Sequence, residues 1–417
     1  MRLPKQELGS NQIGLGQYNE RLILSLVRRE PGIAKAELAR VTKLTPQTIS
    51  VIVNRLIEDG YIITGEKQRG KVGKPSTGLL LNPEGVFSVG VKIGRRSLDV
   101  ILMGFDGSIV KRQTSYHDFP EPAKTLPDIK EAISDMRNAL SPEQSERLIG
   151  IGLAAPGALA SWSHEFETSV QMMQAWQEID LPSEIAAFTD LPVSMMNDVS
   201  AACLAELSLN RERHSHDFLY LYVGTFIGGG IVMNGKLLSG FSGNAAAIGS
   251  MAIGTAQENA APQQLLAKAS LRDLEKRVTA KGHEIKSLHG YQTLTGEILA
   301  LFDEWSDEAS VALAGAIVNA HAVLDTEKIV IDGTLPTSQL QRLIQKVEGA
   351  LQQYDLTGLE RPQFEQGFIG YEARALGGAF LPVYAQFAPD RDVFLKMMNR
   401  NRHVGQPILK YSAQRQD

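Results

Sequence analysis

Residues Ala34–Ile62, AKAELARVTKLTPQTISVIVNRLIEDGYI, contain two short apolar periodicities with a break between them. The first belongs to a segment with an apolar stripe centred on Leu38. Thr45 and Pro46 form the break, because Thr suits a helix N-cap and Pro suits the first position of the helix that follows. The pattern predicts a helix-turn-helix.

The second of these helices has two different faces. Five apolar residues recur at helical spacing and are expected to face a core, namely Ile49, Ile52, Val53, Leu56 and Ile57. The outer face, with the cap, consists of Thr45, Gln47, Thr48, Ser50, Val51, Asn54 and Arg55. A short polar face with one Arg suits base edges in a major groove, where Gln and Asn can pair with adenine and a Val methyl can meet thymine. The alternative is a purely structural hairpin, although such a hairpin more often carries Glu and Lys on this face.

Flanking segments complete a winged helix. Asn19–Arg29 is expected to form a further helix, and Tyr61–Thr64 and Leu79–Leu81 are expected to pair as two strands. The loop between these strands holds four cations suited to phosphate contacts, Lys67, Arg69, Lys71 and Lys74. A solvated basic loop is the alternative interpretation.

Charge is divided unevenly along the 417 residues. Residues 1–85 contain thirteen Lys and Arg against eight Asp and Glu, a formal charge of +5, so the remainder carries −10 of the total of −5. A basic end on an acidic body is typical of a DNA-binding module joined to a separate sensing domain. Because the sequence has neither a signal peptide nor a run of eighteen apolar residues, we expect a soluble, cytoplasmic, nucleoid-associated protein without membrane contact.

From Val86 onward, predicted strands alternate with helices, which indicates an α/β domain. A weak repeat is visible within it. The first copy pairs Val86–Ile93 with Leu98–Phe105 and ends in Asp-Gly, and the second pairs Asp217–Val223 with Gly230–Met233 and ends in Asn-Gly. Two related lobes with a cleft between them are therefore expected.

Several motifs occur in an order that is specific although each alone is weak. They are GKPSTGLLLNP at the end of the wing, LIGIGLAAPGAL at Leu148–Leu159, LPVSMMNDVSAACLAEL at Leu191–Leu207, LYVGTFIGGGIVMNGKLLSG at Leu221–Gly240, IVNAHAVLDTEKIVIDGTL at Ile317–Leu335 and ARALGGAFLPVY at Ala373–Tyr384. In these motifs the chain resembles the ROK family of repressors, open reading frames and sugar kinases.

The resemblance implies a two-lobed actin-like, hexokinase-type (ribonuclease H-like) domain behind the winged helix. The expected organisation is a flexible N-terminus over 1–16, a winged helix-turn-helix domain over 17–84, an effector domain over 85–390 with lobes of roughly 85–200 and 201–390, and an extension over 391–417.

The phosphate-binding turns of the family's kinases are altered in this chain. Their Asp-x-Gly-Gly-Thr turn matches Lys92-Ile93-Gly94-Arg95-Arg96, and Phe226 stands where the second glycine-rich turn should have Gly. Close approach of backbone N–H groups to phosphate needs small residues. ATP-dependent transfer is therefore not expected, and no catalytic residue is assigned.

The family's sugar site is partly retained. Asn197-Asp198 matches the kinases' Asn-Asp pair, whose Asp acts there as general base on the sugar hydroxyl, so the resemblance implies that Gly157, Asn197 and Asp198 contact a ligand. The alternative for Asp198 is a mere N-cap of a helix over Val199–Asn210.

Other family contacts are lost. Ala247 and Ser250 replace a sugar-binding Glu and a His that also binds zinc, and the cysteine-rich zinc loop is absent. Cys203 is the single cysteine and is expected to be a core residue. We expect no metal, no cofactor and no ligand role for the loop His214–Asp217.

Together these features predict a DNA-binding regulator, usually a repressor, that binds an operator as a homodimer or tetramer and senses a sugar-like effector without phosphorylating it. A sugar kinase with a DNA-binding appendage and a repressor controlled by a protein partner remain the alternatives.

Overall fold

The computed structural model describes residues 12–68, 76–117, 119–156, 175–210, 217–254, 262–283 and 293–389. The chain divides into two compact units, the first made of Met1–Met196 with Gly378–Asp417 and the second of Asn197–Gly377. It passes from one to the other after Met196 and again after Gly377.

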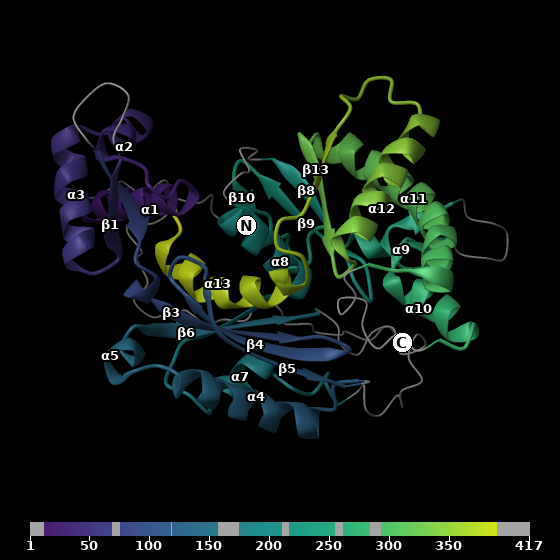
Figure 1. The fold of residues 1–417 in the computed structure, drawn as a ribbon, viewed down its shortest axis with the longest axis horizontal. Helices are drawn as coiled ribbons and strands as arrows, with labels where there is room; N and C mark the ends of the chain where they lie inside the picture. The colour runs from purple at the N-terminus through teal and green to yellow at the C-terminus, as the bar shows by residue number, and fades with distance from the viewer. Residues whose placement is uncertain are drawn as a thin grey trace, which may run out of the picture. The chain divides into compact units, whose positions relative to one another are not determined.

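The first unit begins with a winged helix-turn-helix (Figure 1), as the sequence predicts. Its elements are α1 (Gln12–Arg29), α2 (Lys35–Thr42), α3 (Pro46–Glu58), β1 (Ile62–Gln68) and β2 (Ser76–Leu81). α1 is longer than the expected helix, because it begins at Gln12. Both strands are also longer than expected, because β1 and β2 stay paired outward to Gln68 and Ser76. The small core is formed by the buried side chains of Ile23, Val27, Leu38, Ile49, Val53, Leu56, Ile62 and Leu79.

The break between α2 and α3 has the predicted chemistry. Lys43 ends α2 in the left-handed conformation with φ 60°. Thr45 caps α3, since its Oγ1 accepts a hydrogen bond of 3.1 Å from the Thr48 backbone N–H, and Pro46 takes the first helical position. The predicted start of the second helix is confirmed to the residue.

A mixed five-stranded sheet follows in the order β5-β4-β3-β6-β7. The strands are β3 (Phe87–Ile93), β4 (Ser97–Gly104), β5 (Ile109–Tyr116), β6 (Leu148–Ala155) and β7 (Val193–Asn197). The short helix η1 (Pro83–Gly85) leads from β2 into β3, α5 (Pro142–Ser145) precedes β6, and α7 (Leu181–Ala186) precedes β7. β3 and β4 are completely buried along their length, so this hairpin forms the centre of the unit.

Helices cover both faces of this sheet (Figure 1). α4 (Pro122–Arg137) packs on one face through Ile129, Ile133 and other buried residues. The part of α13 (Ala373–Phe387) that belongs to this unit crosses the other face at Gly152, where a Cβ would come within 1.9 Å of the Gly378 carbonyl oxygen. Only glycine at 152 permits this crossing.

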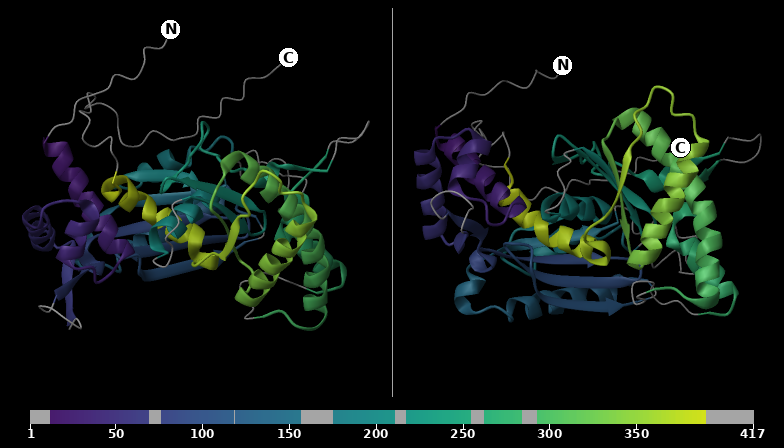
Figure 2. Two further views of the ribbon diagram at one scale, coloured as in Figure 1. Left: turned by 90° about the horizontal axis from the view of Figure 1, so that it is seen from above. Right: turned by 45° about the horizontal axis from the view of Figure 1, so that its top comes forward.

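The second unit contains another five-stranded sheet, in the order β10-β9-β8-β13-β14. Its strands are β8 (Phe218–Val223), β9 (Gly228–Met233), β10 (Lys236–Leu237), β13 (Lys328–Gly333) and β14 (Gln363–Gln366). Its helices are α8 (Asp198–Leu209), η3 (Ile248–Ser250), α9 (Leu266–Ala269), α10 (Leu271–Ala280), α11 (Gly296–Leu324), α12 (Thr337–Ala350), η5 (Leu351–Gln353), η6 (Gly370–Glu372) and the start of α13, and β11 (Ala252–Ile253) pairs with β12 (Gln263–Gln264). The long helices α11 and α12 lie side by side (Figure 2).

The predicted repeat is confirmed. β3 with β4 and β8 with β9 are antiparallel hairpins, and the following turns place Gly107 at φ 92° and Asn234 and Gly235 at φ 53° and 68°. Gly and Asn are the residues that adopt this left-handed region at least cost. The α/β prediction with a winged helix is therefore confirmed.

The core prediction for Cys203 is also confirmed, because this residue is completely buried on α8. Cys203 packs so closely on β9 that a Cβ added at Gly230 would lie 2.4 Å from the Cβ of Cys203.

The described part of the chain contains no helix with the length and apolar character of a membrane span.

Candidate DNA interface and effector site

The α3 helix presents the predicted outer face to solvent. Ile49, Val53 and Leu56 are buried, whereas Thr45, Gln47, Val51, Asn54 and Arg55 are exposed, and 65% of Val51 is accessible. Single exposed apolar side chains are common on protein surfaces, so the exposure of Val51 shows only that its methyl groups are available for contact with a base.

Two members of this face are half-buried. Thr48 lies 2.8 Å from Thr45 between hydroxyl oxygens, and Ser50 donates its hydroxyl to the Pro46 carbonyl at 2.9 Å. Their hydroxyls are bonded within the first turn of α3, and sequence patterning could not distinguish this arrangement from hydroxyls that face solvent.

Two of the five exposed members have partners that the sequence analysis missed. Arg55 forms an ion pair with Glu20 of α1, so this cation connects the reading helix to the first helix. Asn54 accepts a hydrogen bond through Oδ1 from Nζ of Lys35, the first residue of α2, at 2.7 Å. Lys35 of α2 therefore lies against the predicted reading face.

The predicted wing contacts are only partly visible. Lys67 lies in β1, and Arg69, Lys71 and Lys74 lie outside the described residues. The phosphate-binding role of these four residues remains a prediction.

A buried arginine joins the winged helix to the rest of the first unit. Arg28, the penultimate residue of α1, is 8% exposed and donates a hydrogen bond to the carbonyl oxygen of Phe105. Its guanidinium carbon lies 4.9 Å from the ring centroids of both Phe105 and Phe380. Tyr61 and Phe387 extend this cluster, with ring centroids 5.4 Å apart.

In the second unit, the Asn197-Asp198 pair begins α8. The N-cap is Asn197, whose Oδ1 accepts hydrogen bonds from the backbone N–H groups of Val199 and Ser200 at 3.0 and 3.3 Å. The alternative that Asp198 acts merely as the N-cap is therefore wrong, since the preceding residue takes that role. Asp198 is the first helical residue and is 6% exposed.

Asp198 is held by an ion pair. Its Oδ2 accepts a hydrogen bond of 3.3 Å from Arg374 of α13, whose guanidinium carbon lies 4.8 Å from the ring centroid of Tyr222. The Tyr222 hydroxyl in turn donates to the carbonyls of Gly370 and Tyr371 at 3.5 and 3.4 Å, and burial raises the pKa of this phenol well above its usual value. The orientation of Asp198 is thus fixed by its own unit.

A second buried carboxylate lies beside this group. Asp332 is completely buried and accepts hydrogen bonds from the Tyr220 hydroxyl at 2.8 Å and from the backbone N–H groups of Gly333 and Gly370 at 2.8 and 3.2 Å. Burial and the nearby Glu206 carboxylate raise the pKa of Asp332 to about 6, although these hydrogen bonds partly oppose the rise.

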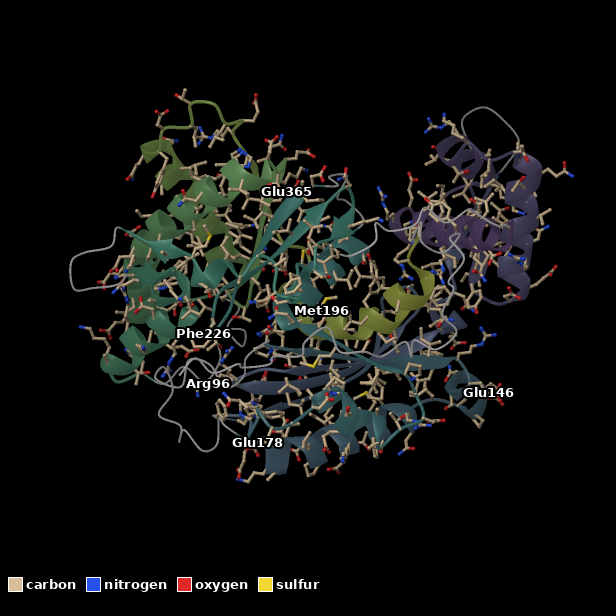
Figure 3. All side chains as sticks on the ribbon, turned by 180° about the vertical axis from the view of Figure 1, so that it is seen from behind. Arg96, Glu146, Glu178, Met196, Phe226 and Glu365 are labelled. Atoms are coloured by element: carbon tan, nitrogen blue, oxygen red, sulfur yellow. The ribbon has the colours of Figure 1, made fainter. Side chains whose placement is uncertain are left out.

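The altered turn of the first hairpin holds an internal ion pair. Lys92 and Asp99 face each other across β3 and β4, are 3% and 4% exposed, and lie 2.9 Å apart from Nζ to Oδ2. Burial alone would raise the pKa of Asp99, but Lys92 together with hydrogen bonds from Thr114 and Ser97 lowers it to about 2. Lys92 is therefore a structural cation, whereas Arg96, labelled in Figure 3, lies half-exposed in the turn itself.

The second turn is closed by a helix. The carbonyls of Gly224 and Thr225 accept hydrogen bonds from the N–H groups of Leu271 and Arg272 in the first turn of α10, at 2.9 and 3.2 Å. Phe226, labelled in Figure 3, is half-buried in this turn. Helix N-terminal N–H groups that could bind phosphate are thus already bonded within the protein.

The remaining expectations concern the replaced sugar contacts, metal binding and three segments outside the described residues. Ala247 and Ser250 lie at η3, and Ser250 is exposed. No cluster of three His, Cys, Asp or Glu suited to a metal occurs among the described residues. Gly157, residues 214–216 and the extension over 391–417 lie outside the described part.

Comparison with known proteins matches the two parts of the chain to two family profiles. The ROK family profile matches residues 88–382, and a winged helix-turn-helix DNA-binding profile matches residues 17–63. The protein y4fQ of Sinorhizobium fredii is 25% identical over 370 residues, covering 88% of this chain and 91% of that protein. The xylose repressor of Bacillus subtilis is 26% identical over 247 residues, which are 58% of this chain and 62% of the repressor.

A solved structure of a ROK family transcriptional regulator, a homolog of the Escherichia coli MLC protein, superposes with a TM-score of 0.62. It is 21% identical and covers 90% of this chain and 98% of its own. This likeness supports the fold assignment.

The raised pKa of Asp332 predicts a pH-dependent stability. Because its pKa of about 6 in the folded protein exceeds the ordinary 3.8, the folded state binds this proton more tightly than the unfolded state. The resulting stabilisation, about 3 kcal/mol, is complete below about pH 4 and is lost as the pH rises through 6. Asp332→Asn should remove this part of the slope when the free energy of unfolding is measured by denaturant titration between pH 4 and 8. Asp355→Asn, at an exposed carboxyl of the same unit, should keep the slope, and an unchanged slope in Asp332→Asn would contradict the assignment.

Proposed function

The chain belongs to the ROK family, and from this premise we propose that it is a DNA-binding transcriptional repressor that responds to a sugar or sugar-like effector without phosphorylating it. Its relatives include a protein named xylose repressor, which supports this class of function. We further propose that it acts in the cytoplasm as a homodimer or tetramer.

The observation that supports DNA reading best is the outer face of α3. A Thr45-capped helix with a buried apolar side presents Gln47, Val51 and Asn54 to solvent within a winged helix. These positions are spaced by four and three residues, so they form one stripe along the helix. Such a stripe fits into a major groove, and two α3 helices of a symmetric dimer can then read half-sites one helical turn, or a multiple of it, apart.

Asn197 and Asp198 offer the groups that a polyol needs. Within the described part of the chain, neither the Asn197 amide Nδ2 nor Asp198 Oδ1 has a protein hydrogen-bond partner, whereas the other polar atom of each side chain is bonded. The pair therefore presents one donor beside one acceptor. A diol can satisfy both, since each hydroxyl can donate and accept.

We propose that the effector signal travels along α13. This single helix contributes Arg374 to the Asp198 pair at its start and Phe380 and Phe387 to the Arg28 cluster at its end. An effector that donates to Oδ1 of Asp198 shares this carboxylate with Arg374, which is bonded to Oδ2, and thereby weakens the ion pair. Any resulting shift of Arg374 is transmitted through one hydrogen-bonded helix to the residues that hold α1.

Two alternatives are less well supported. A kinase needs accessible donors for phosphate, but Lys92 is paired with Asp99 and the N–H groups that begin α10 are bonded to the hairpin turn. Control by a protein partner is favoured by the loss of the Glu and His at Ala247 and Ser250. The adjacent donor and acceptor at Asn197 and Asp198 nevertheless favour a small molecule.

The division of labour between α3 and the wing can be tested by gel-shift titration at several salt concentrations. Gln47→Ala should cost about 1–3 kcal/mol on the operator and nothing on random DNA, because it removes a base contact. Lys71→Ala should weaken binding to both DNAs and lower the salt slope by about one, because it removes a phosphate contact. Equal losses of Gln47→Ala on operator and random DNA would refute the reading role.

We expect no ATP-dependent phosphorylation of any hexose and no thermal stabilisation by ATP-Mg²⁺. Lys92 is paired with Asp99, and the N–H groups of Leu271 and Arg272 are bonded to the second hairpin turn, so phosphate oxygens find too few partners there. A coupled kinase assay with glucose and xylose gives the measurement. Turnover that disappears in Asp198→Asn would establish the kinase alternative.

Effector binding should depend on Asp198. A thermal-shift screen of sugars, polyols, sugar acids and sugar phosphates, starting with xylose, should identify a ligand; at a hundred times its dissociation constant it should add about 2.7 kcal/mol to stability. Asp198→Asn should then weaken binding at least tenfold in calorimetry, because a hydrogen bond to a charged group contributes about 1.5–3 kcal/mol. Asp307→Asn, at an ion-paired carboxylate on α11, is the matched control.

The same ligand tests the role of α13. The Phe387→Ala variant should bind the effector with the affinity of the wild type. It should release operator DNA only at effector concentrations higher than those that the wild type needs.

If Asp198→Asn binds the effector normally, the site lies elsewhere and the protein-partner alternative gains support.

A further inference from the structure

Lys35 and Asn54 form a contact that the DNA-reading proposal does not use. Lys35 begins α2, Asn54 lies in the third turn of α3, and 2.7 Å separates Nζ from Oδ1. An ammonium can only donate, so the atom facing it must be the amide oxygen. This fixes the orientation of the Asn54 amide and leaves both protons of Nδ2 available.

This arrangement changes which base Asn54 can read. The bidentate Asn contact with adenine needs Oδ1 to accept from N6 while Nδ2 donates to N7. Lys35 already uses one of the two lone pairs of Oδ1, so adenine N6 would have to donate to the second lone pair beside the Lys35 ammonium. Two donors, one of them charged, would then lie side by side, and the remaining N–H groups of the ammonium would face a base donor where they need an acceptor.

Guanine matches the pair without that conflict. Its major-groove edge presents two acceptors, O6 and N7, and no donor. Nζ of Lys35 and Nδ2 of Asn54 flank the shared Oδ1 and offer one donor each. The two donors of the protein and the two acceptors of the base are therefore complementary.

The position of Asn54 favours a base over a phosphate. Asn54 follows Gln47 and Val51 along one exposed stripe of α3, and a residue in line with base-contacting positions faces the floor of the groove. Arg55, the neighbouring cation, is bound by Glu20 of α1. Lys35 is thus the cation that the fold places against this stripe.

We infer that Lys35 and Asn54 act together as a two-donor reader of one guanine in each half-site. The inference rests on the proposed DNA-binding function and assigns to it a base and a residue outside the helix-turn-helix reading face.

Selection from a library of duplexes with a randomised 30-base-pair core tests this inference with the full chain. The wild type should enrich sites with one guanine per half-site that Asn54→Ala and Lys35→Met no longer prefer. Lys35→Arg should retain the preference, because it keeps the donors, and Gln47→Ala should retain it while relaxing another position. Replacing that guanine by 7-deazaguanine, which lacks N7, should weaken wild-type binding about tenfold and leave Asn54→Ala and Lys35→Met nearly unchanged.

The outcomes separate the inference from the function on which it rests. A wild-type preference for adenine at the base position whose selectivity is lost in Asn54→Ala would overturn the inference. It would mean that the Asn54 side chain releases Lys35 when the protein binds DNA. Equal weakening of Lys35→Met on every sequence, with a lower salt slope, would also overturn it and make Lys35 a phosphate contact. Failure of the wild type to enrich any site would refute the DNA-binding proposal itself. Because both side chains lie at the surface, unchanged thermal unfolding of the variants confirms that folding is not the cause.

Discussion

The buried guanidinium of Arg28 is the constraint on which the placement of the reading helix depends. A charge removed from water is tolerated only where other groups compensate for the lost hydration. Arg28 meets this requirement with a carbonyl acceptor at Phe105 and with aromatic rings of Phe105 and Phe380 at equal distances. The end of α1 is thereby held on the first unit, and α3 is held through its ion pair with Glu20 of the same helix.

One helix connects this constraint with Asp198 of the proposed effector site. α13 contains Arg374 four positions after Gly370 and ends at Phe387, so its two ends belong to different units and contact different functional groups. The unit boundary falls between Gly377 and Gly378, and adjacent glycines are a common site of helix bending. The helix is therefore suited both to transmit a displacement and to absorb part of it.

Sequence patterning was sufficient wherever the determinants are local. Thr45 and Pro46 specify the start of α3, and the Asp-Gly and Asn-Gly turns specify the paired hairpins, because each depends on neighbouring residues. Lys92 with Asp99, Arg374 with Asp198 and Lys35 with Asn54 could not be predicted in this way. These partners are brought together by strand pairing or helix packing, and no periodicity records which polar side chains then meet. The cap of α8 was missed by one residue, since Asn and Asp are both good caps and only the backbone dihedrals decide between them.

The distribution of donors bears on whether the two hairpin turns of this fold can hold a phosphate. Phosphoryl transfer depends on donors and cations aimed at a polyanion, with their hydrogen-bonding capacity unspent. In this chain the Lys92 ammonium is neutralised by Asp99, and the N–H groups of Leu271 and Arg272 are bonded to the second hairpin turn. Under the proposed function a neutral polyol needs only one donor and one acceptor, the groups that Asn197 and Asp198 would provide.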